Sequence, residues 1–302
     1  MWQTLHSELL NGDVKALARS ISLVENEAAG FENFLASLPF SETKIIGVTG
    51  PPGAGKSTLV DALIGEVIKE NKKAAVLCID PSSPFHLGAL LGDRIRMSQW
   101  YTHPDVFIRS LATKGSLGGL HPKIIEITSL VSAADFDYVF VETVGVGQSE
   151  VEIAGLADVT VVVLVPEAGD EIQSMKAGLM EIADIFVVNK SDRPGANTLI
   201  KQIQLMLAPM SSPSKKQIQI IKTIASQQQG LPELFDAIKN YKNFLATNEK
   251  KYWLLTEKVW KLIKDNRIKD LNKSNLFEEI KNMDVSSFNL YRFAKQFYTI
   301  LD

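Results

Sequence analysis

The sequence has little of what would place a protein outside the cell or in a membrane. Its single cysteine, Cys78, excludes an intramolecular disulfide. No apolar run reaches the roughly 18 residues of a membrane span, and residues 1–12 lack the basic and apolar regions of a secretory signal. A formal net charge of −3 gives no general attraction for nucleic acid or anionic lipid. We therefore expect a cytoplasmic protein that binds neither nucleic acid nor membranes.

Clustered metal-binding side chains are also missing. The four histidines are scattered, and none has a second ligand at metal-binding spacing: they are His6, His86, His103 and His121. We interpret them as structural or surface residues. The hydrophobic content of 45% and charged content of 22% are those of an ordinary globular protein, so a sizeable core can form. Cys78 lies in an apolar run, which predicts a buried core thiol.

The pattern of apolar residues predicts an α/β fold. Short runs of strand length alternate with longer amphipathic stretches, which is typical of a mainly parallel sheet flanked by helices. The runs are apolar on both faces, as expected where helices cover both sides of the sheet. They are 45–49, 74–79, 106–108, 138–141, 159–165, 185–188 and 218–221. We expect a helical extension over 1–40 with a break at Asn11-Gly12-Asp13, a nucleotide-binding domain over 41–247, and a C-terminal helical extension over 248–302. For the apolar face of this last region two roles stay open, packing onto the core and dimer contact with a second subunit.

A phosphate-binding loop follows the first strand. The sequence GPPGAGKS matches the Walker A pattern, with a strand before it and an amphipathic helix after it, as the pattern requires. Glycines let backbone N–H groups approach phosphate oxygens, and the positive end of the next helix points at the same anion. Lys56 is expected to reach the β- and γ-phosphates and Ser57 to bind Mg²⁺. The predicted phosphate-binding residues are Gly50, Pro51, Pro52, Gly53, Ala54, Gly55, Lys56, Ser57 and Thr58.

A second motif, Asn189-Lys190-Ser191-Asp192, ends another apolar strand and predicts guanine recognition. The Asp192 carboxylate can accept two hydrogen bonds from guanine, whereas adenine presents an acceptor at that edge. Asn189 can brace the neighbouring loop, and the stem of Lys190 can lie along the base. Ala225, after the last strand, is a further candidate for a backbone contact with the base.

Three acids and a glycine lie at strand ends or between strands, where P-loop proteins hold their metal. Glu142 ends an apolar strand, and its length favours contact through a metal-bound water. The glycine three residues later, Gly145, can sense the γ-phosphate. Asp80 and Asp93 are candidate outer ligands, and for each a simple turn or helix-capping role stays open. The sequence therefore predicts a Mg²⁺ site formed by Ser57, Asp80, Asp93 and Glu142.

Taken together, these strings resemble the GTPases associated with methylmalonyl-CoA mutase, the MeaB or ArgK-type family that includes the human MMAA protein. The resemblance rests on GVTGPPGAGKSTL, CIDPSSPFHLGALLGDRIRM, VETVGVGQSE, AGDEIQSMKAG, VVNKSD and, near the N-terminus, NGDVKALARSISLVEN. It spans roughly residues 8 to 247. Two departures limit it: the loop at Ala225 is unusually rich in glutamine, and no string after Asn248 matches the family.

The resemblance implies a function for the chain and for one polar segment. Residues 169–176 follow a very apolar strand, and from the residues alone both a catalytic role and simple solvation stay open. The resemblance implies that Asp170, Gln173 and Lys176 form a switch that responds to a partner, an adenosylcobalamin-dependent acyl-CoA mutase of the methylmalonyl-CoA type. It further implies a homodimeric GTP hydrolase that gates cofactor delivery and protects the mutase, and that meets adenosylcobalamin only through that mutase.

Three other functions fit the same core. A GTPase that inserts a metal into another enzyme is one, although such proteins commonly carry histidine-rich tracts or Cys/His pairs, which are absent here. A nucleotide-dependent kinase, as the ArgK name suggests, is the second, and Asp192 argues against its use of ATP. The third is a non-catalytic scaffold whose helical ends bind partners while the nucleotide has a structural role.

Overall fold

The structure is a computed structural model, and it divides the chain into two compact units, Met1–Lys251 and Tyr252–Asp302. It describes residues 1–80, 97–113, 120–143, 149–168, 180, 182–208 and 218–241 of the first unit. In the second unit it describes residues 256–257, 259–264, 273–282 and 296. Within the described residues, no helix is long and apolar enough to cross a membrane.

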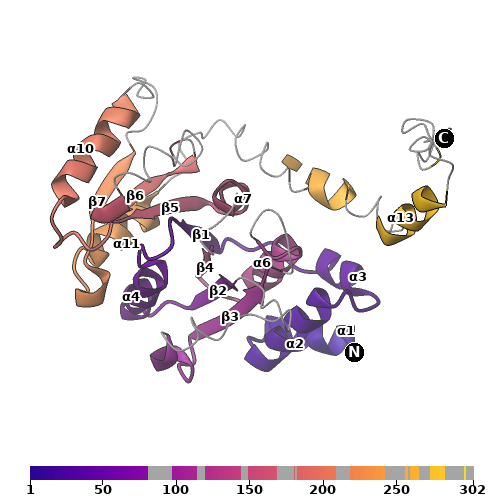
Figure 1. Cartoon of the computed structure of the whole chain (residues 1–302). Helices are drawn as coiled ribbons and strands as arrows, with labels where there is room; N and C mark the ends of the chain where they lie inside the picture. The colour runs from indigo at the N-terminus through magenta and orange to yellow at the C-terminus, as the bar shows by residue number, and fades with distance from the viewer. Residues whose placement is uncertain are drawn as a thin grey trace. The chain divides into compact units, whose positions relative to one another are not determined.

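A seven-stranded, wholly parallel sheet forms the centre of the first unit (Figure 1). The strand order is β3-β2-β4-β1-β5-β6-β7, so β1 lies in the middle between β4 and β5. The strands are β1 Lys44–Thr49, β2 Ala74–Asp80, β3 Val106–Ala112, β4 Tyr138–Glu142, β5 Val159–Leu164, β6 Ile185–Val188 and β7 Gln219–Lys222. All seven expected runs are strands, and the α/β prediction is confirmed.

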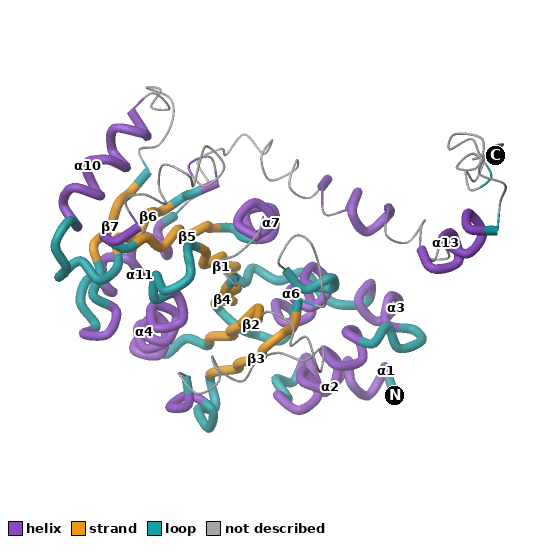
Figure 2. The backbone as a smooth tube through the Cα atoms, viewed as in Figure 1, coloured by secondary structure: helices purple, strands orange, loops and turns teal. Residues whose placement is uncertain are grey.

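Helices cover both faces of the sheet, which explains why the strands are apolar on both sides (Figure 2). Among its described residues, the elements outside the sheet in this unit are α1 Trp2–Leu10, α2 Val14–Glu25, α3 Phe31–Ala36, α4 Lys56–Lys69, α6 Ile124–Ser132, α7 Ser149–Leu156, α10 Ala196–Leu207 and α11 Leu231–Asn240, with short 3-10 turns η1 Ser98–Trp100, η2 Pro166–Ala168 and η4 Ala225–Gln227.

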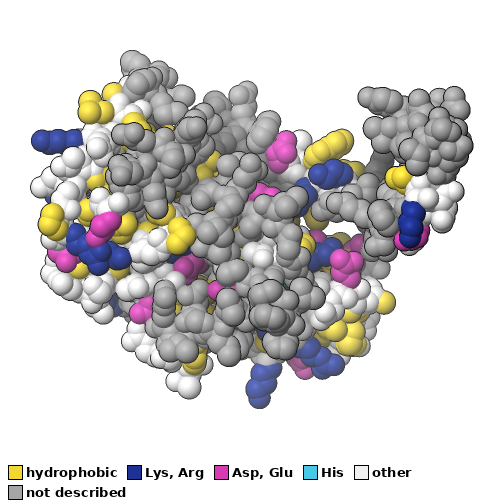
Figure 3. Space-filling view, viewed as in Figure 1, with side chains coloured by type: hydrophobic (Ala, Val, Ile, Leu, Met, Phe, Trp, Pro, Cys, Tyr) yellow, Lys and Arg dark blue, Asp and Glu magenta, His cyan; other side chains and the backbone are white. Residues whose placement is uncertain are grey.

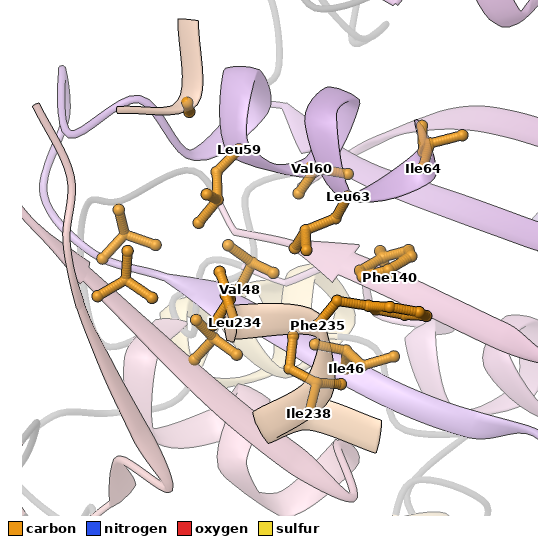
Figure 4. Close-up of a cluster of buried hydrophobic side chains, with 14 of the residues drawn as sticks. Ile46, Val48, Leu59, Val60, Leu63, Ile64, Phe140, Leu234, Phe235 and Ile238 are labelled. Carbon is orange, nitrogen blue, oxygen red and sulfur yellow. The ribbon is translucent and has the colours of Figure 1, made fainter. Parts of the chain in front are cut away.

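One face of the sheet packs against α4 and α11. Figure 4 shows Leu59 and Leu63 of α4 and Leu234 of α11 lying over Val48 of β1 and Phe140 of β4. These side chains are all fully buried. Burying a side chain of this size contributes about 1.5–3 kcal/mol, so the helix that follows the phosphate loop is fixed firmly to the strand that precedes it.

The opposite face carries the N-terminal helices and α6, α7 and α10. Leu77 of β2 and Val141 of β4 pack there with Leu17 of α2 and Ile127 of α6, while α10 covers β5 and β6. Strand side chains alternate between the two faces, so neighbours such as Val141 and Phe140 enter different clusters. The expected break between the first two helices is present, with the Asp13 carboxylate capping α2 by accepting the N–H groups of residues 15 and 16.

The positions of the cysteine and of the charged side chains agree with what the sequence composition predicts. Cys78 is buried in the core, as predicted. On the face seen in Figure 3, basic and acidic side chains of the described residues lie interspersed.

In the second unit, residues 259–264 and α13 Lys273–Lys281 are helical. Trp260 and Val259 are exposed there, at 61% and 52% of their surface.

Candidate nucleotide-binding site

The candidate site lies at the carboxyl edge of the sheet. Because all the strands are parallel, the residues that follow β1, β2, β4 and β6 emerge at the same edge, which is where ligands bind in open α/β sheets. The register pairs Val48 of β1 with Glu142 of β4, and Cys78 of β2 with the same Glu142. The phosphate loop, Glu142 and Asp80 are therefore brought to one end of the sheet.

The phosphate loop has the backbone that its glycines predict. Gly50, Gly53 and Gly55 all have positive φ, at 142°, 76° and 86°. A Cβ on Gly50 would lie 2.1 Å from the carbonyl oxygen of Val163 in β5, so only glycine fits there. Helix α4 then begins at Lys56, directly after Gly55. The loop thus leads into a helix N-terminus, whose free N–H groups favour an anion.

Lys56 is held inside the loop. Its side chain is only 7% exposed, and Nζ donates to the carbonyl oxygens of Gly50 at 2.8 Å and Pro51 at 3.1 Å. The loop thereby carries a buried positive charge beside the N-terminus of α4. A buried ammonium at this position is well placed to bind a phosphate oxygen, because charge-assisted hydrogen bonds are stronger than neutral ones.

The predicted metal residues present a set of oxygens suited to Mg²⁺. The Ser57 hydroxyl donates to Glu142 Oε1 at 2.7 Å, and a hydroxyl oxygen that donates its proton in this way can still offer a lone pair to a cation. Ser57, Glu142 and Asp80 are all buried. Among the described residues no three His, Cys, Asp or Glu side chains gather into a complete metal site. Mg²⁺ usually takes one or two protein oxygens together with phosphate and water, so this donor set fits the ion.

Asn189 connects the predicted base-binding motif to the phosphate loop. It is 2% exposed and lies just after β6. Its Nδ2 donates to the Ala54 carbonyl at 2.9 Å, while its Oδ1 accepts from Thr223 Oγ1 and from the Ala225 N–H, both at 3.1 Å. The bracing role predicted for Asn189 is thus visible in the geometry. The Ala225 N–H, predicted to contact guanine, donates to Asn189.

Lys190 and Asp192 belong to the loop after β6 that is predicted to bind the base, called the base-binding loop below. Lys190 Nζ donates to the Gly53 carbonyl at 2.8 Å, which draws its stem across the phosphate loop. Lys190 has a φ of 52°, an uncommon value that marks a tight turn. Asp192 is exposed, and the neighbouring Ser191 N–H donates to the Thr223 carbonyl at 3.1 Å. The loop after β6 is therefore tied to the loop after β7, with the Asp192 carboxylate accessible.

Five of the candidate residues lie outside the described residues: Asp93, Gly145, Asp170, Gln173 and Lys176. The structure adds contacts that reasoning from the sequence missed. Thr49 and Thr143 share a buried hydrogen bond next to the phosphate loop. Arg193, just after Asp192, pairs with Glu167 of η2. No local sequence signal predicts either contact, because each joins residues that are distant in the chain.

The fold and the loop geometry define a P-loop nucleotide-binding protein, and comparison with known proteins gives its family. The family model described as "Methylmalonyl Co-A mutase-associated GTPase MeaB" matches residues 17–276. The chain belongs to this family, and it is accordingly a GTP-binding enzyme that hydrolyses GTP to GDP and phosphate.

Individual relatives and a solved structure agree. A relative in Pyrococcus abyssi is 43% identical over 289 residues, covering 94% of this chain and 84% of its own. The "Methylmalonic aciduria type A homolog, mitochondrial" of Caenorhabditis elegans is 39% identical over 209 residues, which cover 63% of this chain and 52% of that protein. The crystal structure of a LAO/AO transport system kinase superposes with a TM-score of 0.67 at 24% identity, covering 98% of this chain and 96% of that one. This last likeness shows the fold alone.

Proposed function

We propose that this GTPase is a chaperone of an adenosylcobalamin-dependent acyl-CoA mutase of the methylmalonyl-CoA type. The observation that carries the proposal is the family match over residues 17–276, whose description names that mutase. The name of the Caenorhabditis elegans relative points to the same area of metabolism. GTP binding and hydrolysis gate delivery of the cofactor to the mutase and protect that enzyme. The chain meets adenosylcobalamin only through its partner.

In this proposal, different described residues bind the phosphates, the base and the Mg²⁺ ion of bound GTP. The phosphate-loop N–H groups and Lys56 hold the β- and γ-phosphates, with Lys56 exchanging its carbonyl partners for phosphate oxygens. Asp192 selects guanine by accepting its two N–H groups, and Asn189 keeps the base loop and phosphate loop in register. Ser57 holds Mg²⁺, with Glu142 and Asp80 around it. The ion, when bound, neutralises charge that develops on the phosphates.

Hydrolysis proceeds by in-line attack of water on the γ-phosphate, and Lys56 stabilises the charge of the transition state. Asp93 and Gly145 belong to the same site in this proposal, as an outer metal ligand and as a sensor of the γ-phosphate. Asp170, Gln173 and Lys176 form the switch that the mutase orders, which raises a slow intrinsic rate.

We assign residues 1–40 to a helical extension, 41–247 to the GTPase domain and 248–302 to dimer contacts. Support for the last assignment comes from apolar side chains that are exposed in the described part of that region: Val259, Trp260, Leu262 and Ile263. Light scattering of the purified chain tests the dimer, with Trp260→Glu as the variant expected to shift it to monomer.

Phosphate release measured with GTP and with ATP, each with and without purified mutase, tests the function. We expect release from GTP only, and faster release when the mutase is present. Preference for ATP would favour a kinase and overturn guanine selection. GTP hydrolysis that the mutase leaves unchanged, together with failure of the two proteins to co-purify, would contradict the chaperone role and leave a metal-insertion GTPase as the alternative.

A further inference from the structure

A pair of buried threonines lies where strands β1 and β4 separate. The ladder between these strands ends with the Val48 and Glu142 pair, and the Thr143 N–H still donates to the Val48 carbonyl at 3.0 Å. One residue further, the Thr143 hydroxyl donates to the Thr49 hydroxyl at 2.9 Å. Their side chains are 1% and 0% exposed. A side-chain contact thus extends the link between the two strands beyond their backbone pairing.

Both threonines adjoin the proposed metal site. Thr49 immediately precedes Gly50, the first residue of the phosphate loop, and Thr143 immediately follows Glu142. Glu142 in turn accepts the Ser57 hydroxyl at 2.7 Å. The threonine pair and the bond between Ser57 and Glu142 therefore join the same two parts of the chain, the phosphate-loop region and the end of β4.

Packing alone does not call for hydroxyl groups at these two positions. Valine has nearly the shape of threonine, and replacing both partners of a buried hydrogen bond by apolar groups of the same shape is often nearly neutral for stability. A hydrogen bond differs from a valine pair in being directional, because it fixes the distance and the orientation of the two groups that it joins. The hydroxyl pair thus adds a fixed distance and orientation between Thr49 and Thr143, which a valine pair would not provide.

We propose that the Thr49 and Thr143 hydroxyl pair positions the Glu142 carboxylate against the Ser57 hydroxyl for Mg²⁺-dependent GTP hydrolysis. The inference rests on the proposed metal site at Ser57 and Glu142. Groups that orient a ligand without touching the ion typically change metal affinity or activity by about 10–100-fold when removed. Both threonines are positioning residues, because they act through Glu142 and the phosphate loop.

The test uses the full-length chain with both threonines replaced, Thr49→Val and Thr143→Val together. We expect this double variant to melt close to the wild-type temperature and to need at least about tenfold more Mg²⁺ for half-maximal GTP hydrolysis. Each single valine variant leaves one buried hydroxyl without its partner, so it is expected to melt lower. Thr143→Ser keeps the hydroxyl and is expected to retain the wild-type Mg²⁺ requirement. Thr128→Val, which changes a buried threonine of α6, is the matched control.

Glu142→Gln separates failure of this inference from failure of the metal site beneath it. If Glu142→Gln leaves the Mg²⁺ requirement unchanged, the metal site is wrongly assigned and the inference fails with it. If Glu142→Gln raises the requirement while the stable double valine variant keeps wild-type Mg²⁺ dependence and turnover, the threonine pair has only a packing role and the inference alone is overturned. A double variant that melts far below wild type would also contradict it, because the pair would then be needed for folding.

Discussion

Asn189 holds the Ala54 carbonyl of the phosphate loop at 2.9 Å, although the two residues lie 135 positions apart in the chain. The same amide accepts hydrogen bonds from Thr223 and Ala225, which follow β7. One buried side chain therefore joins the phosphate loop, the base-binding loop and the loop after β7. A substitution that displaces one of these loops is therefore expected to displace the other two as well.

Replacing Asn189 by alanine is expected to weaken both stability and nucleotide binding. The change leaves the Ala54 carbonyl, the Thr223 hydroxyl and the Ala225 N–H buried without their partner, which costs about 2–4 kcal/mol in the free energy of unfolding. We expect GDP and GTP affinity to fall at least about tenfold. Urea unfolding and nucleotide titration measure the two effects. Asn197→Ala, at an exposed position of α10, is the control, and equal loss in both variants would contradict the bracing role.

Replacing Asp192 by asparagine tests purine selection. The carboxylate is proposed to accept two guanine N–H groups, and charge-assisted hydrogen bonds contribute about 1.5–3 kcal/mol each, so we expect GTP affinity to fall by about two orders of magnitude. Xanthine carries a carbonyl where guanine carries its exocyclic amine, and an asparagine amide can donate to that carbonyl. XTP should therefore bind the variant better than it binds the wild type. Unchanged discrimination among GTP, ATP and XTP would refute the assignment.

The sequence alone predicted the sheet well because strands β2, β4, β5 and β6 are buried along their whole length. Residues 74–79 are continuously apolar and enter the clusters on both faces of the sheet, which requires helices on both sides. The Walker A glycines likewise predicted a loop with positive φ angles. Gly50 has such an angle, which few residues other than glycine tolerate. These features are local, so they can be read from a short stretch of sequence.

Other features depend on contacts between distant residues, and the sequence did not reveal them. Nothing near Thr49 signals that its hydroxyl meets Thr143, because that contact follows from the pairing of β1 with β4. The N-terminal helices were expected as an extension, yet Leu17 and Ile21 of α2 are buried in the same cluster as strands β2 and β4. Amphipathic spacing indicates that a helix has a buried face but not which surface covers it.

The phosphate loop offers a matched pair of glycine substitutions. Gly50 and Gly53 both have positive φ, but a Cβ on Gly50 would lie 2.1 Å from the Val163 carbonyl oxygen, whereas one on Gly53 would meet nothing within 4 Å. Gly53→Ala is expected to cost about 1–2 kcal/mol, the backbone strain alone. Gly50→Ala adds a clash with a central strand, so its midpoint of thermal unfolding should fall well below that of Gly53→Ala. Equal melting temperatures would show that β5 moves freely.

Asp137 is expected to make stability depend on acid pH. Burial raises the pKa of this carboxyl, but hydrogen bonds from Lys72 and from the Lys73 N–H outweigh burial and hold the pKa below its ordinary value of 3.8. A carboxyl with a lowered pKa in the folded state stabilises the protein fully above pH 3.8, and its contribution is lost as pH falls through the folded value.

Asp137→Asn should therefore be less stable than the wild type near pH 7, and the difference between the two should shrink as pH falls below about 3.8. Thermal unfolding at a series of pH values measures this convergence. Asp135→Asn, at an exposed partner of Lys73, is the control. A stability difference that stays constant across the acid range would contradict the assignment of the pKa shift to the lysine contacts.

Arg193 and Glu167 provide a route from the base-binding loop towards the proposed switch. Arg193 directly follows Asp192 and pairs with Glu167 of η2, which lies just before residues 169–176. The hydrogen bond from Arg193 lowers the pKa of Glu167, so the pair is charged at neutral pH. Both side chains are about half exposed, at 47% and 51%, so the pair adds little to stability.

If the mutase acts through residues 169–176, the pair should affect stimulation more than basal hydrolysis. We expect Arg193→Glu to lower mutase-stimulated GTP hydrolysis by about two- to fivefold, the range open to an exposed ion pair, with basal hydrolysis unchanged. The double variant Arg193→Glu with Glu167→Arg exchanges the two charges and so restores an ion pair. It should recover most of the stimulation by the mutase. A double variant as poor as the single one would show that Arg193 acts on the mutase directly, because only a coupling between these two side chains predicts that rescue.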